Sequence, residues 1–538
     1  MNKLAMNQRK RLEDIGAILI KYGFEKVVLE IIPITARLRL RGLRPQIGEE
    51  GTYVRLREAL SELGPTFIKF GHYMRTRPDL LPPELVKELE LLPDKTKPIP
   101  FEEVKKIVEK KIGKIDEVFT ELNEEPLSSG SLSQKHVATL KEGDKVVLKI
   151  KRPEISDAID TDLKTLEIIA LHAGKISDEL KLFNFPEVVK EFSMEIRKEL
   201  DFVEEGKNAE LLSKDMGEFT KIRVPRIYWK YTCEDLLTIE YVEGEAIDHV
   251  DKITAIGINT KELALLCFRS YLKQIFIDGF YHGDPEPENL MVTRESELVF
   301  IDFGLMGVLR KGKRDTFTQL MIALIDDDAD DVVRSMEGLG LWGRSEDREL
   351  LSDDIYVVLK EAKVKTSYES GNKLASIIAA VRKRDLGLPM QSMLAINTLL
   401  KVDFNMKALY PDFKLMDETS TYLNDTAMKR VVDFGNIRRS GASFLDTIQS
   451  SRELPQHVND ALLTITEGPI RFKLDYENLD NLAKSVDNAT YRILIAVALV
   501  ILSSQNITIF NFPISTMIAY LLAVSLGAFA VYKLFLNK

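Results

Sequence analysis

Two short motifs contain the residues of this sequence whose types and spacing best suit catalysis. Asp284 is followed five residues later by Asn289, and Asp302-Phe303-Gly304 begins thirteen residues beyond that. In phosphoryl-transfer sites an aspartate orients or deprotonates the attacking hydroxyl, while an asparagine and a second aspartate hold Mg²⁺ against the ATP phosphates. The order and spacing therefore predict a kinase-like site that uses ATP and Mg²⁺, with Asp284 as catalytic residue and Asn289 and Asp302 as metal ligands.

A site of this kind also needs a lysine that binds phosphate, and Lys149 is the candidate. It follows the aliphatic residues 146–148 in a predicted strand, where kinases carry their phosphate-binding lysine. A strand lysine among aliphatic residues otherwise usually faces solvent. Upstream lies a loop of small residues whose backbone N–H groups and hydroxyls suit phosphate oxygens: Ser128, Ser129, Gly130 and Ser131. Alone, this loop reads as an ordinary polar turn, but its position before the Lys149 strand favours a nucleotide-binding loop.

The lysine needs an acidic partner that holds its side chain toward the nucleotide. Residues 185–210 have helical apolar spacing and supply Glu199, Asp201 and Glu205. Spacing alone selects none of them, because helix carboxylates most often form a solvated face. Glu199 and Glu205 are six residues apart, about 120° around one continuous helix, so we expect them to serve different partners.

The elements that position these motifs alternate between helical and strand patterns. Apolar spacing predicts helices over 101–122 and 185–210. Strands are predicted over 135–140, 145–151, 236–241, 291–292 and 298–301. Residues 1–100 and the chain beyond residue 260 are expected to be largely helical, with a turn at 141–144 joining the first two strands. The sequence therefore predicts an α+β fold.

Composition limits the class of protein. The chain has 538 residues, 45% of them hydrophobic, which is enough for two or three domains with their own cores. A net charge of −10 argues against nucleic acid as a partner. Cys233 and Cys267 are the only cysteines, which excludes a disulfide framework and fits a reducing compartment, and no pair of the six histidines has metal-ligand spacing.

The C-terminal region has a different composition, because no Asp, Glu, Lys or Arg occurs between Ile493 and Tyr532. This length suits two membrane spans of about 20 residues each, with a turn at 511–513. Arg492 and Lys533 then flank the pair on one side, which the positive-inside rule places in the cytoplasm. We expect a protein of the cell membrane with two C-terminal transmembrane helices and a cytoplasmic catalytic domain. The alternative is a helical hairpin buried in a soluble core.

In this order, the motifs resemble the UbiB/AarF family of atypical protein-kinase-like proteins, which includes proteins that support isoprenoid-quinone biosynthesis. The resemblance covers roughly residues 15–535. The family's Lys-x-Gly-Gln signature corresponds to Lys69-Phe70-Gly71-His72, its alanine-rich nucleotide loop to 128–131, and its Glu-x-Asp motif to Glu199-Leu200-Asp201.

The resemblance implies roles for individual residues. Lys69 would pair with Glu199, so that the N-terminal extension crosses the face where a protein substrate would otherwise lie. Glu205 would be the partner of Lys149. The residues beside the adenine would be Glu240 and Val242. The regulatory residues would be Lys69, Gly71, His72, Glu199 and Asp201.

Several residues depart from the family pattern. His72 replaces the glutamine, which changes the hydrogen bonding of the extension and introduces a group that titrates near neutral pH. Gly130 stands where the family usually has alanine, which frees the loop backbone and favours nucleotide binding. Glu286 and Glu288 add two carboxylates close to a triphosphate site, where they either repel ATP or recruit a further cation. No Ala-Pro-Glu follows the motif at 302–304, which argues against a kinase that acts on protein chains.

The implied architecture is a bilobal protein-kinase-like fold with additional helical parts. Its expected divisions are a helical N-terminal extension at 1–100, an N-lobe at 101–242, a C-lobe at 243–345, a helical C-terminal region at 346–490 and a transmembrane hairpin at 491–538.

The implied function is an atypical kinase-like, Mg²⁺-ATP-dependent ATPase at the membrane. It would support the synthesis or mobilisation of isoprenoid quinones or related prenyl lipids. Its expected partners are ATP, a membrane lipid or prenylated small molecule, and enzymes of lipid biosynthesis. Two alternatives use the same residues: a phosphotransferase acting on a small molecule or lipid, and a nucleotide-gated scaffold that binds lipid or protein with little turnover.

Overall fold

The computed structural model describes most of the chain up to residue 433 and two short strands beyond it. The described ranges are 3–31, 44–45, 51–93, 96–176, 185–343, 345–364, 373–384, 386–433, 508–509 and 512–513. The chain divides into two compact units, Met1–Val432 and Asp433–Lys538.

In the second unit, β12 (Thr508–Ile509) pairs antiparallel with β13 (Phe512–Pro513), so two of the three residues predicted to form the turn at 511–513 lie in a paired strand instead. The rest of the predicted transmembrane hairpin at 491–538 lies outside the described residues, as does the expected helical region from 434 to 490. Within the described ranges, no helix is both long enough and apolar enough to span a bilayer.

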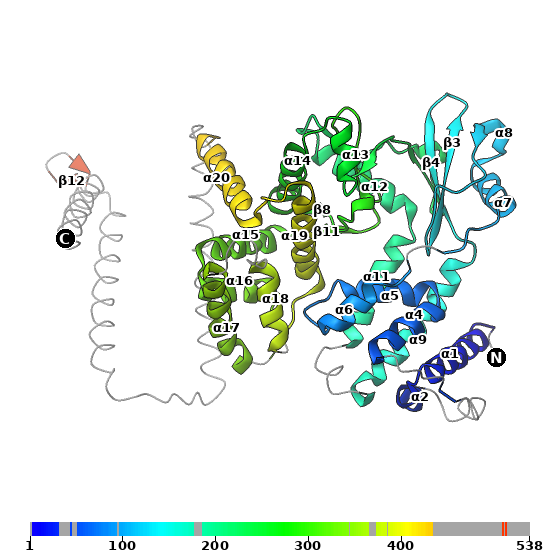
Figure 1. The fold of residues 1–538 in the computed structure, drawn as a ribbon, viewed down its shortest axis with the longest axis horizontal. Helices are drawn as coiled ribbons and strands as arrows, with labels where there is room; N and C mark the ends of the chain where they lie inside the picture. Colours follow the sequence, from blue (N-terminus) through cyan, green and yellow to red (C-terminus); the bar gives the residue numbers. More distant parts are fainter. Residues whose placement is uncertain are drawn as a thin grey trace. The chain divides into compact units, whose positions relative to one another are not determined.

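The N-lobe is built on a five-stranded antiparallel sheet in the order β1-β3-β4-β6, with β2 paired to β3. Its strands are β1 (Phe119–Leu122), β2 (Ser128–Ser129), β3 (Ser133–Leu140), β4 (Lys145–Lys151) and β6 (Leu236–Glu240). Figure 1 shows β3 and β4 side by side, with α7 (Phe101–Ile112) and α8 (Ile115–Val118) next to them. Residues 222–223, expected in this lobe, form β5 (Ile222–Arg223) and pair with a C-lobe strand instead.

The predicted hairpin of β3 and β4 is present, and its turn contains Gly143 at φ 93°, which glycine adopts without steric cost. Val146 and Leu148 face inward and pack with Val104 and other residues of α7. The helix predicted over 101–122 was too long. Gly113 ends α7 at φ 105°, and residues 119–122 pair with β3.

The C-lobe is mainly helical. Its helices are α13 (Val250–Ala255), α14 (Thr260–Lys273), η3 (Gln274–Asp278), α15 (Lys311–Asp326) and α16 (Ala329–Leu339). They pack with α12 (Phe202–Asp215) from the N-lobe range and with the helices of the C-terminal region: α17 (Ser345–Val364), α18 (Lys373–Lys383), α19 (Met390–Leu409) and α20 (Leu415–Asp433). They share one apolar core, to which α19 contributes Met393, Ile396, Leu399 and Met406.

Two small sheets in this lobe carry the metal motif. One has the order β5-β10-β9-β7, and the other is the antiparallel pair β8–β11. Their remaining strands are β7 (Glu245–Ala246), β8 (Phe280–His282), β9 (Leu290–Val292), β10 (Leu298–Phe300) and β11 (Met306–Val308). The turn η4 (Pro287–Asn289) precedes β9. Asp284 therefore follows β8, Asn289 precedes β9, and Asp302 follows β10, which brings the three together.

The helix predicted over 185–210 is two helices, α11 (Phe185–Glu199) and α12. Asp201 is the N-cap of α12, because its carboxylate accepts hydrogen bonds from the backbone N–H groups of Val203 at 3.0 Å and Glu204 at 3.4 Å. The expectation that Glu199 and Glu205 lie on one continuous helix was therefore wrong.

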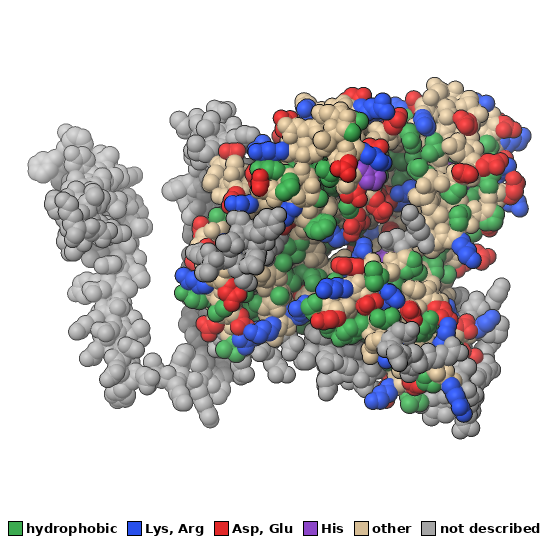
Figure 2. Space-filling model, in the orientation of Figure 1, with side chains coloured by type: hydrophobic (Ala, Val, Ile, Leu, Met, Phe, Trp, Pro, Cys, Tyr) green, Lys and Arg blue, Asp and Glu red, His purple; other side chains and the backbone are tan. Residues whose placement is uncertain are grey.

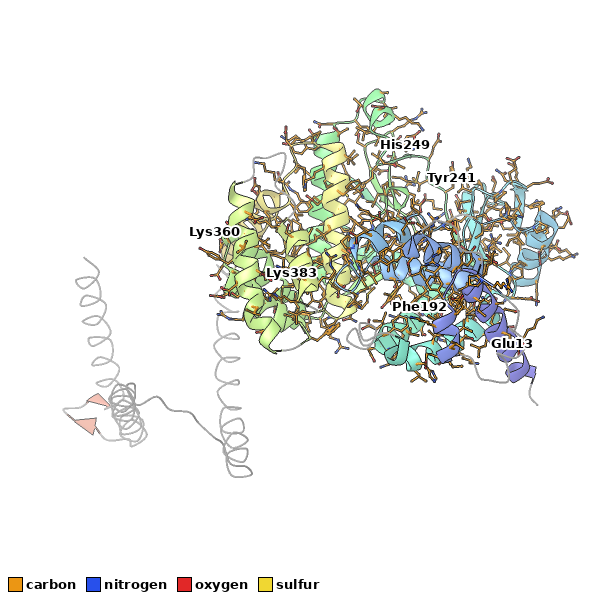
Figure 3. The ribbon with its side chains drawn as sticks, turned by 60° about the horizontal axis from the view of Figure 1, so that its bottom comes forward. Glu13, Phe192, Tyr241, His249, Lys360 and Lys383 are labelled. Atoms are coloured by element: carbon orange, nitrogen blue, oxygen red, sulfur yellow. The ribbon has the colours of Figure 1, made fainter. Side chains whose placement is uncertain are left out.

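The N-terminal extension is helical, as expected. Its helices are α1 (Lys3–Lys21), α2 (Glu25–Ile31), α4 (Thr52–Leu63), α5 (Pro65–Arg75) and α6 (Pro83–Glu90), and they pack with α9 (Ile155–Ile176) and α11. Phe192 of α11, labelled in Figure 3, lies against Phe70 and Tyr73 of α5, whose ring centroids are 5.1 and 5.4 Å from its own. These contacts pack α5 against α11, the helix that ends at Glu199.

Candidate nucleotide and metal site

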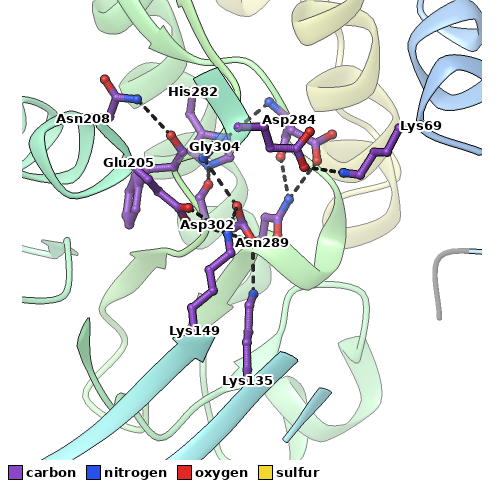
Figure 4. Close-up of polar contacts among 12 residues, drawn as sticks. Lys69, Lys135, Lys149, Glu205, Asn208, His282, Asp284, Asn289, Asp302 and Gly304 are labelled. Carbon is purple, nitrogen blue, oxygen red and sulfur yellow. Dashed lines mark hydrogen bonds and ion pairs between the residues drawn. The ribbon is translucent and has the colours of Figure 1, made fainter. Parts of the chain in front are cut away.

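Lys149 lies at the centre of the site. Strand β4 directs its side chain between two carboxylates: Nζ is 2.7 and 2.9 Å from the two oxygens of Glu205, and 3.2 Å from each oxygen of Asp302 (Figure 4). Lys149 and Glu205 are both buried. The pairing of Lys149 with Glu205 that the family resemblance implied is therefore present in the structure.

The surroundings shift the pKa values of Lys149, Asp302 and Glu205 in different ways. Burial opposes the charge of Lys149, but Asp302 and Glu205 outweigh it and raise the pKa of Lys149. Burial also opposes the charge of Asp302, yet Lys149 and Lys135 hold the pKa of Asp302 well below its usual range. Burial raises the pKa of Glu205, with Lys149 acting in the opposite direction. Asp302 is thus the firmly ionised carboxylate, as a metal ligand needs to be.

Lys135 is a second lysine at the site that sequence reasoning missed. It lies directly across the hairpin from Lys149, and its Nζ is 3.1 Å from Asp302 Oδ2. The predicted hairpin was one residue out of register: a four-residue turn at 141–144 sets Lys135 opposite Ile150. The observed pairing of Thr139 with Lys145 sets Lys135 opposite Lys149 instead.

Asp302 has a backbone conformation that asparagine, aspartate and glycine tolerate best, with φ 64°. The ring of His282 holds this conformation through a 2.7 Å contact from Nε2 to the Asp302 carbonyl oxygen. Burial lowers the pKa of His282, so the ring is neutral and Nε2–H donates the bond. The carboxylate of Asp302 therefore has a defined direction toward Lys149.

Asn289 and Asp284 form the other half of the site. The amide nitrogen of Asn289 donates to the Asp284 backbone oxygen at 3.1 Å and to its carboxylate Oδ2 at 3.0 Å. Both bonds use the nitrogen, so the amide oxygen is the atom that can face a cation. A carboxylate and an amide oxygen fit Mg²⁺, which usually takes one or two protein ligands and completes its shell with phosphates and water. The described ranges contain no group of three or more His, Cys, Asp or Glu arranged to hold a metal.

Asp284 has a cationic neighbour that the sequence did not reveal. Lys401 Nζ from α19 is 3.1 Å from Asp284 Oδ1 and 2.6 Å from Glu286 Oε1. Burial opposes the charge of Asp284, but Lys401 outweighs it and lowers the pKa of Asp284. Arg75 of α5 also reaches Glu286 Oε1, at 3.4 Å. Nothing in the local sequence marked Lys401 or Arg75, because both contacts join distant parts of the chain.

The predicted nucleotide loop at 128–131 is held in place by two residues outside it. Arg152 Nε and Thr96 Oγ1 both donate to the Gly130 carbonyl oxygen, at 2.8 and 2.6 Å, and Arg152 also donates to Ser129 Oγ at 2.7 Å. The N–H of Gly130 donates to the Ser133 oxygen at 2.9 Å. The Gly130 amide, one of the N–H groups that the sequence suggested for phosphate, is therefore engaged within the loop. Ser128 is exposed and Ser131 is buried.

The predicted regulatory residues are on three helices: Lys69, Gly71 and His72 lie on α5, Glu199 ends α11, and Asp201 caps α12. Lys69 Nζ on α5 forms an ion pair with Glu199 Oε1, as the resemblance implied, and Glu199 outweighs burial to raise the pKa of Lys69. Gly71 is buried where an added Cβ would clash with the Leu92 side chain, so its small size allows α5 to pack closely. His72 is half-buried on the same helix.

The residues expected beside the adenine lie at the end of β6. Glu240 accepts a bond from Arg223 at 2.6 Å and one from the Arg226 N–H at 3.1 Å, so its carboxylate is already used. Val242 follows it and is half-buried. In Figure 2, Asp and Glu side chains gather in the recess between the strand-rich and helical lobes, with Lys and Arg side chains around them.

Comparison with known proteins identifies similar chains. Residues 91–336 match the model of the ABC1 atypical kinase-like domain. A probable protein kinase UbiB of Marinobacter nauticus is 32% identical over 432 residues, covering 77% of each chain. A protein from the 5′ region of hydrogenase 1 of Clostridium pasteurianum is 28% identical over 91% of this chain and 90% of its own. Protein ACTIVITY OF BC1 COMPLEX KINASE 7, chloroplastic, of Arabidopsis thaliana is 28% identical over 82% of this chain and 62% of its own.

Proposed function

The chain belongs to the UbiB/AarF family of ABC1 atypical kinase-like proteins, and from this premise we propose that it hydrolyses Mg²⁺-ATP at the membrane. One observation carries the proposal: Lys149 contacts both Glu205 and Asp302, while Asn289 contacts Asp284 on the facing loop. These are the contacts that a phosphoryl-transfer site needs around its phosphates and its nucleophile.

Each side chain has a distinct role in this proposal. Lys149 binds the ATP phosphates, and Glu205 directs the lysine toward them. Asn289 and Asp302 hold Mg²⁺, which when bound neutralises part of the phosphate charge. Asp284 accepts the proton of the attacking water, or of a lipid-like hydroxyl.

The remaining predicted residues surround the nucleotide or control access to it. Residues 128–131 cover the phosphates, and the end of β6 at Glu240 and Val242 lies beside the adenine. The ion pair of Lys69 with Glu199 keeps the N-terminal extension over the face that a protein substrate would use. With no Ala-Pro-Glu segment after Gly304, the acceptor is water or a small or lipid molecule.

The proposed setting is the cell membrane, with residues 491–538 as a transmembrane hairpin and the kinase-like part in the cytoplasm. The UbiB/AarF family includes proteins that support isoprenoid-quinone biosynthesis, so membership supports a role in isoprenoid-quinone or related prenyl-lipid synthesis or mobilisation. Its partners would then be a prenylated molecule or membrane lipid and enzymes of that synthesis.

The test is phosphate release from Mg²⁺-ATP by the full-length protein on liposomes, compared with Asp284→Asn. Loss of the proton acceptor should reduce the rate about 10²-fold or more. Asp412→Asn, an exposed aspartate outside the site, is the matched control and should hydrolyse ATP as the wild type does. Equal, background rates in wild type and Asp284→Asn would refute the proposed hydrolysis.

Two related functions are outcomes of the same assay. A phosphorylated lipid or small molecule in place of free phosphate would identify a phosphotransferase. ATP binding without turnover would identify a nucleotide-gated scaffold. The second outcome has one specific observation in its favour, because Asp302 is held by two lysines, Lys135 and Lys149, in the position where it would bind metal.

A further inference from the structure

Helix α19 is mostly apolar and buried, yet three of its polar side chains contact the same short loop. Thr398 Oγ1 lies 3.4 Å from the Gly283 oxygen, and Asn405 Nδ2 donates to the Pro285 oxygen at 2.6 Å. Between them, Lys401 Nζ contacts the carboxylates of Asp284 at 3.1 Å and Glu286 at 2.6 Å. Positions 398, 401 and 405 share one helix face. Helix α19, which lies outside the matched kinase-like domain, therefore holds the loop at 283–286 that contains Asp284, the proposed general base.

The loop at 283–286 needs a cation for an electrostatic reason. Asp284 and Glu286 place two carboxylates next to the position of a polyphosphate, where like charges repel. Lys401 contacts both of them. Arg75, on α5 in the N-terminal extension, also contacts Glu286. Lys401 and Asp284 both remain about a third exposed, at 30% and 32% of their side chains, so a ligand can reach the pair.

Glu286 links the two cations, Lys401 and Arg75. A single carboxylate oxygen, Oε1, accepts from both Lys401 and Arg75, so Glu286 fixes the lysine where it also reaches Asp284. The acidic departure from the family motif is thus compensated by cations from two distant helices.

We propose that Lys401 is a positioning residue of the active site, which orients Asp284 and supplies positive charge beside the phosphoryl group being transferred. Glu286 holds Lys401 in that place, and Arg75 supports Glu286. This inference rests on the proposed ATP hydrolysis and extends it to a residue of the helical C-terminal region.

The first experiment compares turnover with nucleotide binding in the full-length protein on liposomes. Lys401→Met should lower kcat about 10²-fold, the effect expected when a catalytic group loses its orientation, with a much smaller change in the Kd of ATP. Lys401→Arg should recover most of the rate. Lys414→Met, which removes an exposed lysine paired with Asp417, is the control.

An unchanged kcat in Lys401→Met would overturn the proposal. So would an equal loss of kcat and ATP binding with no recovery in Lys401→Arg, because that pattern indicates a structural role alone.

A second measurement separates this inference from the proposed hydrolysis, since it needs no turnover. Without Lys401, the carboxylates of Asp284 and Glu286 should bind an additional Mn²⁺, seen by electron paramagnetic resonance titration of the nucleotide-free protein. Lys401→Arg and Lys414→Met should bind no more Mn²⁺ than the wild type. If wild type and Asp284→Asn are equally inactive, hydrolysis is refuted, and the Mn²⁺ titration alone tests the role of Lys401. If Lys401→Met then binds no additional Mn²⁺, Lys401 is not the cation that neutralises Asp284 and Glu286.

Discussion

At the scale of single residues, Lys149 contacts two carboxylates at once, buried Glu205 and half-buried Asp302. Lys149→Met leaves Glu205 without a cation, while Lys135 still contacts Asp302, and should destabilise the protein by about 3 kcal/mol, as breaking a buried ion pair does. We also expect loss of ATP binding, because the same Nζ is the proposed phosphate contact. Urea denaturation and nucleotide titration of the full-length protein measure the two effects.

The control for this substitution is Lys145→Met, at the exposed start of the same strand. It should change neither quantity appreciably. Adding Glu205→Leu to Lys149→Met should restore part of the stability but none of the binding, since the apolar pair removes the stranded charge. A double variant no more stable than Lys149→Met would contradict the electrostatic explanation.

The residues of the site were only partly predictable. Asp284, Asn289 and Asp302 stand in local motifs with fixed spacing, and the Lys149–Glu205 and Lys69–Glu199 pairings came from the family resemblance. Lys401 and Arg75 were missed because a lysine on an apolar helix and an arginine at a helix end have no local signal. Their function appears only when α5 and α19 meet the loop at 283–286.

At the scale of elements, strand β3 contains a histidine that should make stability depend on pH. His136 is fully buried: its Nδ1 is 2.8 Å from the Asn123 oxygen, and its Nε2 is 2.8 Å from Gln134 Nε2. The neutral ring satisfies both contacts, with Nδ1–H as donor and Nε2 as acceptor. Burial lowers the pKa of His136, and the bond to Asn123 only partly opposes this.

The unfolded chain takes up a proton at His136 as the pH falls through about 6.5, while the folded chain does not until its lower pKa is reached. Stability should therefore fall below pH ~6.5, by at most about 1.4 kcal/mol per pH unit from this group. His136→Gln should show a shallower loss between pH 7 and 5 in denaturation midpoints. His172→Gln on α9 is the control and should follow the wild type. Equal slopes in wild type and His136→Gln would exclude His136 as the source.

The break between α11 and α12 shows how element boundaries were missed. The apolar spacing of 185–210 continues through residue 203, and that periodicity suggested one helix. Yet Asp201 followed by Glu204 is the pattern of a helix start, with a capping residue and an acid three positions later. In the structure, Asp201 caps a new helix. Glu199 and Glu205 therefore lie on separate helices, where Glu199 pairs with Lys69 and Glu205 with Lys149.

At the scale of the whole molecule, the matched kinase-like domain does not by itself contain every residue of the proposed site. Residues 91–336 match the family domain, whereas Lys69 and Arg75 come from before it and Lys401 from after it. The sequence indicated the lobes through periodicity and motif order, but a helical region without motifs gave no sign of its contribution. Each of these three residues reaches the site through contacts with residues more than a hundred positions away in the sequence.

The C-terminal residues lead to the last prediction, that removing 491–538 releases the protein from membranes. The uncharged stretch from Ile493 to Tyr532 is the basis, because its length suits two spans of about 20 residues. The first unit, Met1–Val432, is compact by itself, so the shortened protein should still fold and bind ATP. Flotation on a density gradient after a high-salt wash distinguishes insertion from surface attraction, since salt screens attraction to anionic headgroups.

Replacing 491–538 with an unrelated transmembrane hairpin should return the protein to the membrane fraction, and this variant also tests the prenyl-lipid proposal. If only membrane proximity matters, ATP hydrolysis on liposomes should recover fully. If the native hairpin contributes to lipid recognition, stimulation by prenylated lipids should stay absent while the basal rate returns. Shortened protein that floats with liposomes in high salt would contradict the predicted anchor, and attachment would then have to be sought in residues 1–490.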